Sequence, residues 1–150
     1  MKTQILFTLL CAAVLFNPSI SLSSECDDMA YKIINKVGGK IVRRSSAALT
    51  IRHVLSEKMA VNCGTSPDFY ITANTSHLSK KYLYLIGQAG NAVTGEDADT
   101  IIEAANRCSK DASASSDTFA QANLGRIRVK CQSFTEDTGR NSFTIALDEP

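Results

Sequence analysis

The chain has 150 residues, with 16 Lys and Arg against 15 Asp and Glu, which gives a formal net charge of +1. A general nucleic-acid partner or an anionic membrane surface normally requires a net basic footprint on the protein, so this balance supports neither class of partner. The length suits one hydrophobic core, and therefore a single domain.

The N-terminal segment is typical of a secretory signal peptide. Lys2 is followed by an apolar run over residues 5–16, which as a helix covers roughly 18 Å, well short of the ~30 Å hydrocarbon core of a membrane. A helix breaker and a run of small residues follow, as a signal peptidase requires. We therefore expect residues 1–23 to be removed. Residues 24–150 would then form a single disulfide-bonded globular domain, periplasmic or secreted, with no membrane anchor.

The first part of this domain combines a helix with alternating strands. An apolar stripe over residues 24–37, ended by two glycines, predicts a helix. Apolar and polar residues alternate over residues 47–63, which predicts a β-hairpin, with an amphipathic helix over residues 46–61 as the alternative. A third strand is predicted at Phe69–Thr72.

Two helices are expected in the middle of the chain. Residues 79–91 fit either a buried strand or a helix, and the helical spacing of their apolar residues favours the helix. Residues 94–97 resemble a capping box, and an apolar face with acidic residues early and basic residues late predicts a helix that follows this box. Residues 109–116, a mixture of Ser, Ala, Asp and Lys, are expected to form a surface connection.

The last part of the chain predicts a second hairpin, over residues 126–148, with apolar residues alternating along its first strand. The intervening positions hold three like charges, Arg126, Arg128 and Lys130. Like charges at this spacing repel modestly, so stability alone gives no reason for them. We therefore nominate this basic stripe as a binding surface for an acidic protein partner. The alternative is an ordinary solvated sheet face.

Charge is distributed unevenly along the chain even though the total is close to zero. Residues 32–81 hold nine basic residues against two acidic ones, whereas residues 95–117 hold six acidic residues against two basic ones. The folded molecule is therefore expected to have a basic region and an acidic region.

Four cysteines follow the predicted signal peptide: Cys26, Cys63, Cys108 and Cys131. An even number of cysteines in an exported protein predicts two disulfides. Their spacing contains no pair typical of a metal site, so no metal is expected. Of the three connectivities that four cysteines allow, we favour Cys26 with Cys63 and Cys108 with Cys131.

That pairing rests on an internal similarity. Residues 59–63 followed by Phe69–Ile71 parallel residues 127–131 followed by Phe143–Ile145, and a helix that carries a cysteine precedes each set. The similarity predicts two helix-plus-hairpin halves, each joined by its own disulfide. Chance similarity between short alternating strands is the alternative.

Together these patterns predict an α+β fold, in which a small antiparallel sheet, with hairpins near residues 47–63 and 126–148, carries two or three helices packed on one face. No motif for a nucleophile or a cofactor is present, and no cofactor is expected. The expected function is that of a non-enzymatic exported binding protein, such as an inhibitor, an immunity factor or an envelope accessory protein. The alternative is a small secreted hydrolase or nuclease that uses His53 or His77.

Overall fold

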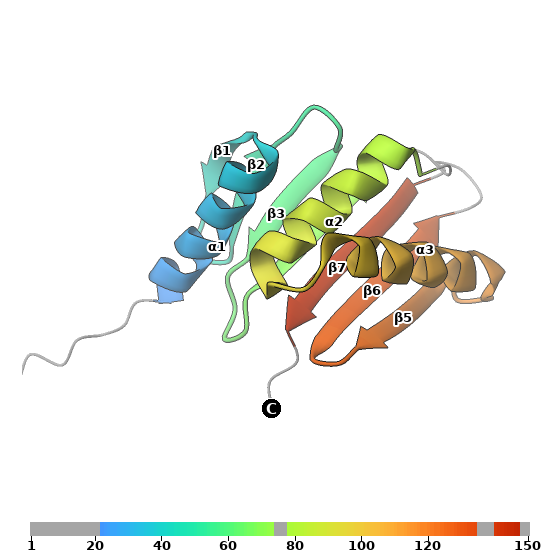
Figure 1. Cartoon of the computed structure of the whole chain (residues 1–150). Coiled ribbons are helices and arrows are strands. Elements are labelled where there is room, and N and C mark those ends of the chain that lie inside the picture. Colours follow the sequence, from blue (N-terminus) through green and yellow to red (C-terminus); the bar gives the residue numbers. More distant parts are fainter. Residues whose placement is uncertain (1–21, 74–77, 135–139, 148–150) are drawn as a thin grey trace, which may run out of the picture.

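The computed structural model describes residues 22–73, 78–134 and 140–147, which form three helices and one antiparallel sheet of seven strands (Figure 1). The predicted α+β class is therefore confirmed. The helices are α1 (Leu22–Val37), α2 (Lys80–Thr94) and α3 (Ala98–Ala114). The strands are β1 (Lys40–Arg44), β2 (Ala48–Arg52), β3 (Lys58–Asn62), β4 (Asp68–Ala73), β5 (Phe119–Leu124), β6 (Ile127–Phe134) and β7 (Arg140–Leu147). Across the sheet the strand order is β1-β2-β3-β4-β7-β6-β5.

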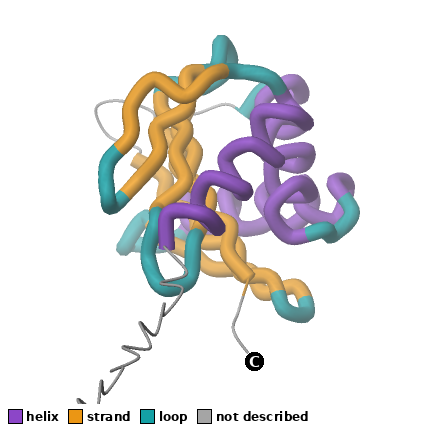
Figure 2. The backbone as a smooth tube through the Cα atoms, turned by 90° about the vertical axis from the view of Figure 1, so that its left-hand side faces the viewer, coloured by secondary structure: helices purple, strands orange, loops and turns teal. Residues whose placement is uncertain are grey.

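The helices and the sheet form two layers, with the helices on one side of the sheet (Figure 2). Along the sheet, α1 contacts β2 and β3, α2 contacts β4 and β7, and α3 contacts β5 and β6. Within the described residues, no helix combines the length and the apolar character that crossing a bilayer requires.

The core lies between these layers and is built on two apolar rows that run across the sheet. Because the strands alternate, every second residue of each strand points towards the helices. Strand register aligns Ile51, Met59, Ile71, Phe143 and Cys131 in one row, and Leu49, Val61, Phe69, Ile145 and Val129 in the other. Each of these side chains is at most 3% exposed. Burial of each large apolar side chain contributes about 1.5–3 kcal/mol relative to exposure.

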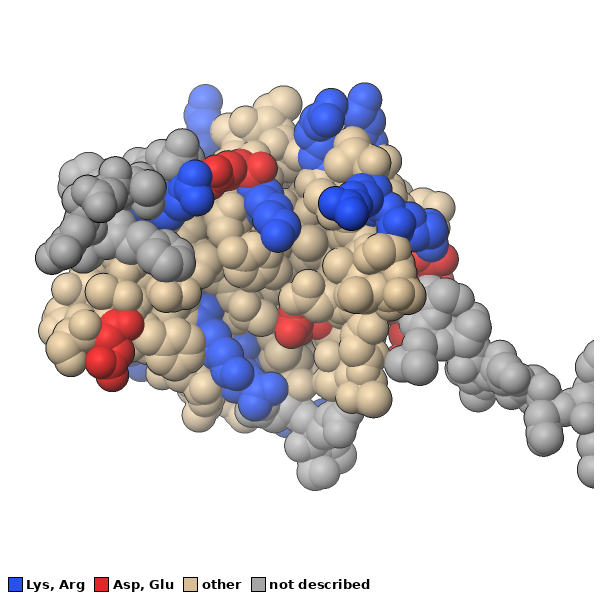
Figure 3. All heavy atoms as spheres, turned by 180° about the vertical axis from the view of Figure 1, so that it is seen from behind, with Lys and Arg blue, Asp and Glu red and all other residues tan. Residues whose placement is uncertain are grey.

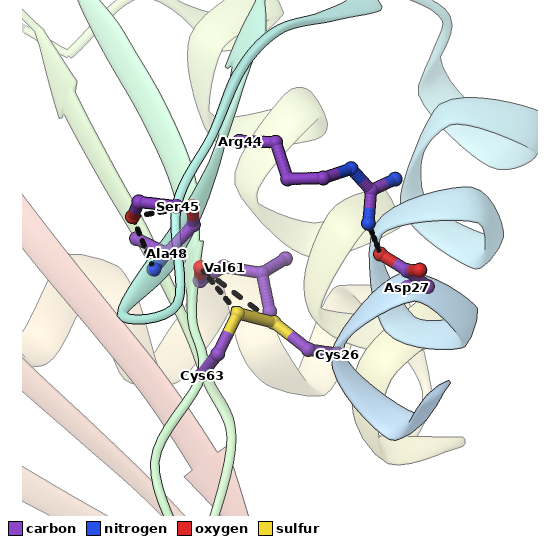
Figure 4. A network of polar contacts seen from close by, with 7 residues as sticks. All are labelled: Cys26, Asp27, Arg44, Ser45, Ala48, Val61 and Cys63. Atoms are coloured by element: carbon purple, nitrogen blue, oxygen red, sulfur yellow. Dashed lines mark hydrogen bonds and ion pairs between the residues drawn. A yellow bond between two sulfur atoms is a disulfide. The ribbon is translucent and has the colours of Figure 1, made fainter. Parts of the chain in front are cut away.

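Two disulfides join the helical layer to the sheet. Cys26 of α1 is bonded to Cys63, directly after β3, and Cys108 of α3 is bonded to Cys131 of β6. Their Cα–Cα distances are 5.4 Å and 6.0 Å, which suit disulfide geometry. The structure thus contains both predicted pairs. Near the first of them, the Arg44 guanidinium of β1 pairs with the carboxylate of α1 residue Asp27 (Figure 4).

The two halves of the chain are related in topology, but not in the way that the sequence similarity predicts. Strands β2-β3-β4 and β5-β6-β7 each follow a helix that carries a cysteine, and they meet at the antiparallel pair β4–β7. Each half therefore has at least three strands rather than a hairpin. The strand register also differs by two residues between the halves. The sequence similarity makes Val61 equivalent to Val129, and Phe69 equivalent to Phe143. Val61 pairs with Phe69, but Phe143 pairs with Cys131 rather than with Val129.

Two local predictions for the helices are wrong. Residues 109–116 are largely helical, since α3 continues to Ala114 and buries Ala112 in the core. The cap of α3 is Asp97, whose carboxylate accepts a hydrogen bond from the Thr100 backbone N–H at 3.1 Å. The predicted capping box instead begins at the last residue of α2, and Gly95 ends that helix in the left-handed region with φ of +76°.

Glycines let α2 approach α3 and the sheet closely. A Cβ atom at Gly87 would lie 2.7 Å from the Ala98 carbonyl oxygen, and one at Gly90 would lie 3.0 Å from the Ile101 side chain. Both positions are buried. The missing side chains therefore set the depth at which α2 packs.

Substitution of Gly87 by alanine tests this close approach. We expect Gly87→Ala to lower the free energy of unfolding by about 1–3 kcal/mol, because the added methyl group would meet both the Ala98 carbonyl oxygen and the Ile102 side chain at 2.7 Å. On helix propensity alone, the same substitution would stabilise α2 by about 1 kcal/mol. Urea unfolding followed by circular dichroism shows whether the variant is less or more stable than the wild type. Gln88→Ala on the same helix is the control. A more stable Gly87→Ala variant would show that α2 and α3 do not pack this closely at Gly87.

Candidate binding surface on the exposed face of the sheet

The face of the sheet turned away from the helices, which we call the outer face, carries a row of side chains that crosses all seven strands. Strand register aligns Arg43, Thr50, Ala60, Tyr70, Thr144, Lys130 and Gln121 in this order from β1 to β5. The row places cationic residues on both sides of a central tyrosine. In Figure 3, which shows the molecule from behind, most of the coloured side chains are blue Lys and Arg, and few are red Asp and Glu.

An open hollow of about 710 Å³ lies on the β1 side of this face, and we call it the Tyr70 hollow. It is lined by residues from β1 to β4, by Glu57 of the β2–β3 turn and by the first residue of β7. The lining residues are Val42, Arg43, Thr50, Glu57, Lys58, Tyr70, Thr72 and Arg140. The hollow thus combines one aromatic ring, two threonine hydroxyls and four charged side chains.

The charges of the Tyr70 hollow do not cancel. Arg140 forms an ion pair with Glu57, with an Nη2–Oε1 distance of 3.1 Å. The Lys58 ammonium lies 5.5 Å from the centre of the Tyr70 ring, a cation–π distance. Among the described residues, neither Arg43 nor Lys58 has a carboxylate partner. Three cations against one carboxylate leave the hollow with a formal charge of +2.

Tyr70 keeps its proton at physiological pH. Partial burial raises the pKa of its hydroxyl above the usual value, and the Glu57 carboxylate raises it further. A hydrogen bond with Ser142 and the charge of Arg140 oppose this shift without reversing it. The neutral hydroxyl can both donate and accept a hydrogen bond, so it suits recognition of a carboxylate better than an ionised phenolate would.

A second tyrosine, Tyr82 of α2, has its hydroxyl buried in the core. Its side chain is almost fully buried, and no described residue provides its hydroxyl with a hydrogen-bond partner. Burial raises the pKa of Tyr82 far above its usual range, with smaller contributions from Tyr70 and Glu57. A buried hydroxyl without a partner costs about 1–3 kcal/mol.

Removal of that hydroxyl is therefore expected to stabilise the fold. In the Tyr82→Phe variant, the free energy of unfolding should rise by about 1 kcal/mol, because an unsatisfied buried group is lost while the ring remains. Urea unfolding measures this change. A decrease of similar size would show that the hydroxyl is hydrogen-bonded in the folded protein.

The raised pKa values of both tyrosines also predict sensitivity to alkali. Because tyrosines in the unfolded chain ionise near pH ~10 while the folded chain keeps them protonated, the free energy of unfolding should fall as the pH rises above about 10. Below that pH both states are protonated, so these groups contribute no dependence. Urea unfolding at a series of alkaline pH values should show that the free energy of unfolding falls less steeply with pH in the Tyr70→Phe/Tyr82→Phe variant than in the wild type. Equal pH dependence in the two proteins would contradict the raised pKa values of the two tyrosines.

The three residues of the predicted basic stripe do not all lie on the outer face. Arg126 lies in the tight turn between β5 and β6, next to Gly125, which adopts φ of +57°. Arg128 and Lys130 lie on the outer face of β6, where they pair with Ala146 and Thr144 of β7. Lys130 is two strands from Tyr70 in the same row, a separation of about 10 Å. Two of the predicted residues therefore share a face with the Tyr70 hollow.

The Tyr70 hollow was not predicted from the sequence. Its residues come from five strands and a turn, and none of the local patterns brings β7 next to β4. The available signal was the excess of basic residues over residues 32–81, which contribute Arg43 and Lys58 to the hollow.

Of the two histidines nominated for the alternative hydrolase, the structure describes His53. His53 accepts a hydrogen bond at Nδ1 from the Leu55 backbone N–H at 3.1 Å, and its Nε2 lies 3.2 Å from the Val37 carbonyl oxygen. Both ring nitrogens therefore have backbone partners, which is typical of a structural histidine. His77 lies outside the described residues. In the described part of the chain, no cluster of three His, Cys, Asp or Glu residues is placed to hold a metal ion.

Comparison of this chain with protein-family models, with curated proteins and with solved structures finds no match.

Proposed function

We propose that this protein is an exported binding protein without catalytic activity, which holds an acidic protein surface against the outer face of its sheet. The observation that carries the proposal is the pair of cations, Arg43 and Lys58, that line the Tyr70 hollow without carboxylate partners in the described structure. Unpaired cations in a hollow attract a partner that brings the missing carboxylates.

The composition of the Tyr70 hollow suits protein recognition. Tyr70 provides a rigid ring with a polar end, a side chain that is enriched at protein interfaces. Arginine binds a carboxylate through two parallel hydrogen bonds, and such charge-assisted bonds are stronger than neutral ones. Thr50 adds a hydroxyl that can donate to a carboxylate or backbone oxygen, whereas the Thr72 hydroxyl donates to the Lys58 carbonyl oxygen at 3.5 Å. Because the hollow is partly enclosed by the sheet, these contacts are less screened than on an open surface.

The two disulfides support the exported part of the proposal. Disulfides form and persist in oxidising compartments such as the periplasm or the extracellular space. Both bridges join a helix to the sheet, so they are part of the fold rather than exposed thiols. The predicted signal peptide supports the same compartment. Its residues 1–21 lie outside the described residues, and its last two, Leu22 and Ser23, form the start of α1.

The proposal is tested by a titration with an Asp/Glu-rich peptide, followed by two-dimensional NMR. We expect chemical-shift changes concentrated at Thr50, Tyr70 and Thr72, and no comparable changes on α1–α3. The Arg43→Ser/Lys58→Ser variant should bind the peptide about tenfold more weakly at low salt. Its melting temperature should be nearly unchanged, because exposed charges contribute little to folding.

A matched control removes the same charge from the other side of the molecule. Lys80→Ser/Lys81→Ser replaces two exposed lysines at the start of α2, and it should leave the affinity for the acidic peptide almost unchanged. If both variants weaken binding equally, or if the shift changes lie on the helices, the outer face is not the binding surface. Equal binding of a Lys-rich peptide of the same length would also overturn the proposal.

A further inference from the structure

The two edges of the sheet differ in how they are protected against pairing with another strand. The β1 edge is five residues long, carries Lys40, Arg43 and Arg44, and has an irregular register between Ile41 and Arg43. Charges, short length and bulges are the usual means of blocking an edge. The β5 edge, Phe119–Leu124, has a regular register and contains no charged residue and no proline. It therefore lacks the charges and the irregular register that protect the β1 edge.

The backbone of β5 presents a regular set of free hydrogen-bonding groups. The Ser133 N–H donates to the Thr118 carbonyl oxygen at 2.8 Å, which identifies these residues as a hydrogen-bonded pair just before β5. Because such pairs alternate along an antiparallel ladder, Ala120, Ala122 and Leu124 direct their backbone groups towards β6. The N–H and C=O groups of Phe119, Gln121 and Asn123 therefore point away from the sheet.

The core is also incomplete at this edge. In the central strands, the apolar residues that point towards the helices are almost fully buried, whereas the equivalent residues of β5, Ala120, Ala122 and Leu124, are only partly buried. On the outer face of the same strand, Phe119 is 46% exposed. A strand added to β5 would extend the apolar layer and cover part of this surface.

We propose that β5 pairs antiparallel with β5 of a second copy of this chain. The free groups are self-complementary about Gln121: a two-fold axis at this residue places Gln121 opposite its own copy, and Phe119 opposite Asn123 on either side. Each of these pairs matches free N–H groups with free C=O groups, for six hydrogen bonds in all. The same register keeps Ala120 opposite Ala122, where two small side chains meet without a clash.

A second copy fits this edge better than an unrelated charged strand would. The edge carries no charge to select a charged partner, and two uncharged copies meet without like-charge repulsion. A two-fold axis perpendicular to the sheet keeps the helical layers of both copies on one side, so the two cores become continuous. The interface is isologous, as is usual in homodimers.

The test uses a proline at Gln121 in the disulfide-bonded chain. Since the Gln121 N–H points away from β6, Gln121→Pro leaves the internal ladder intact but removes a central donor from the edge. Sedimentation velocity over a range of concentrations should show the wild type as a dimer at micromolar concentrations. The dissociation constant of the variant should rise by about 100-fold or more. Gln121→Thr, which keeps the N–H group, is the control and should remain dimeric.

A second pair of variants covers the case in which the proline disturbs folding. Gln121→Lys places two like charges opposite each other on the proposed axis and should also give monomers, while Gln132→Lys, one strand away from the edge, should remain dimeric. Circular dichroism confirms that each variant is folded. A wild type that is monomeric up to millimolar concentration would overturn the proposal. So would a folded Gln121→Pro or Gln121→Lys variant that dimerises as tightly as the wild type.

Discussion

The pairing of β4 with β7 is the interaction on which the rest of the molecule depends. These strands lie far apart in the sequence, and their ladder joins two groups of strands into one sheet. On the helical side it brings Phe69 opposite Ile145 and Ile71 opposite Phe143, at the centre of both apolar rows. On the outer face the same ladder sets Ser142 beside Tyr70 and Arg140 within reach of Glu57. The core and the Tyr70 hollow therefore form together.

The three helices are held over this sheet by two different means. The first and third helices, α1 and α3, are each bonded covalently to the sheet side of the molecule, through Cys63 and Cys131. Disulfides of this kind stabilise a small domain mainly by restricting its unfolded chain. The central helix α2 has no such bond. It contacts β4 and β7, and it packs closely against α3 at Gly87 and against Ile145 of β7 at Gly90. Disulfides thus hold α1 and α3 on the sheet, while close packing alone holds α2.

The sequence predicts those elements whose own pattern determines their structure. The two hairpins alternate cleanly, and the helices show a 3.6-residue period, so these elements are where the sequence places them. Strands β1 and β5 were missed, because three of the five residues of β1 are charged and β5 consists largely of Ala, Gln and Asn, which are poor strand formers. These strands form because a neighbouring strand, β2 or β6, provides backbone hydrogen-bonding partners. Local strand propensity does not reveal such long-range pairing. The Tyr70 hollow has the same origin, since it depends on contacts between distant strands.

The proposed dimer extends the outer-face row of side chains across two copies of the chain. With a two-fold axis at Gln121, the outer-face row that contains Tyr70 and Lys130 continues into the second copy on the same side of the sheet. The two Lys130 side chains are then three strand spacings apart, about 14 Å. This separation exceeds the Debye length of about 8 Å at physiological ionic strength, so their mutual repulsion is largely screened. An acidic partner that spans both copies would meet two Tyr70 hollows and the lysines between them. Because the second contact becomes intramolecular, such a partner would bind more tightly than either hollow allows alone.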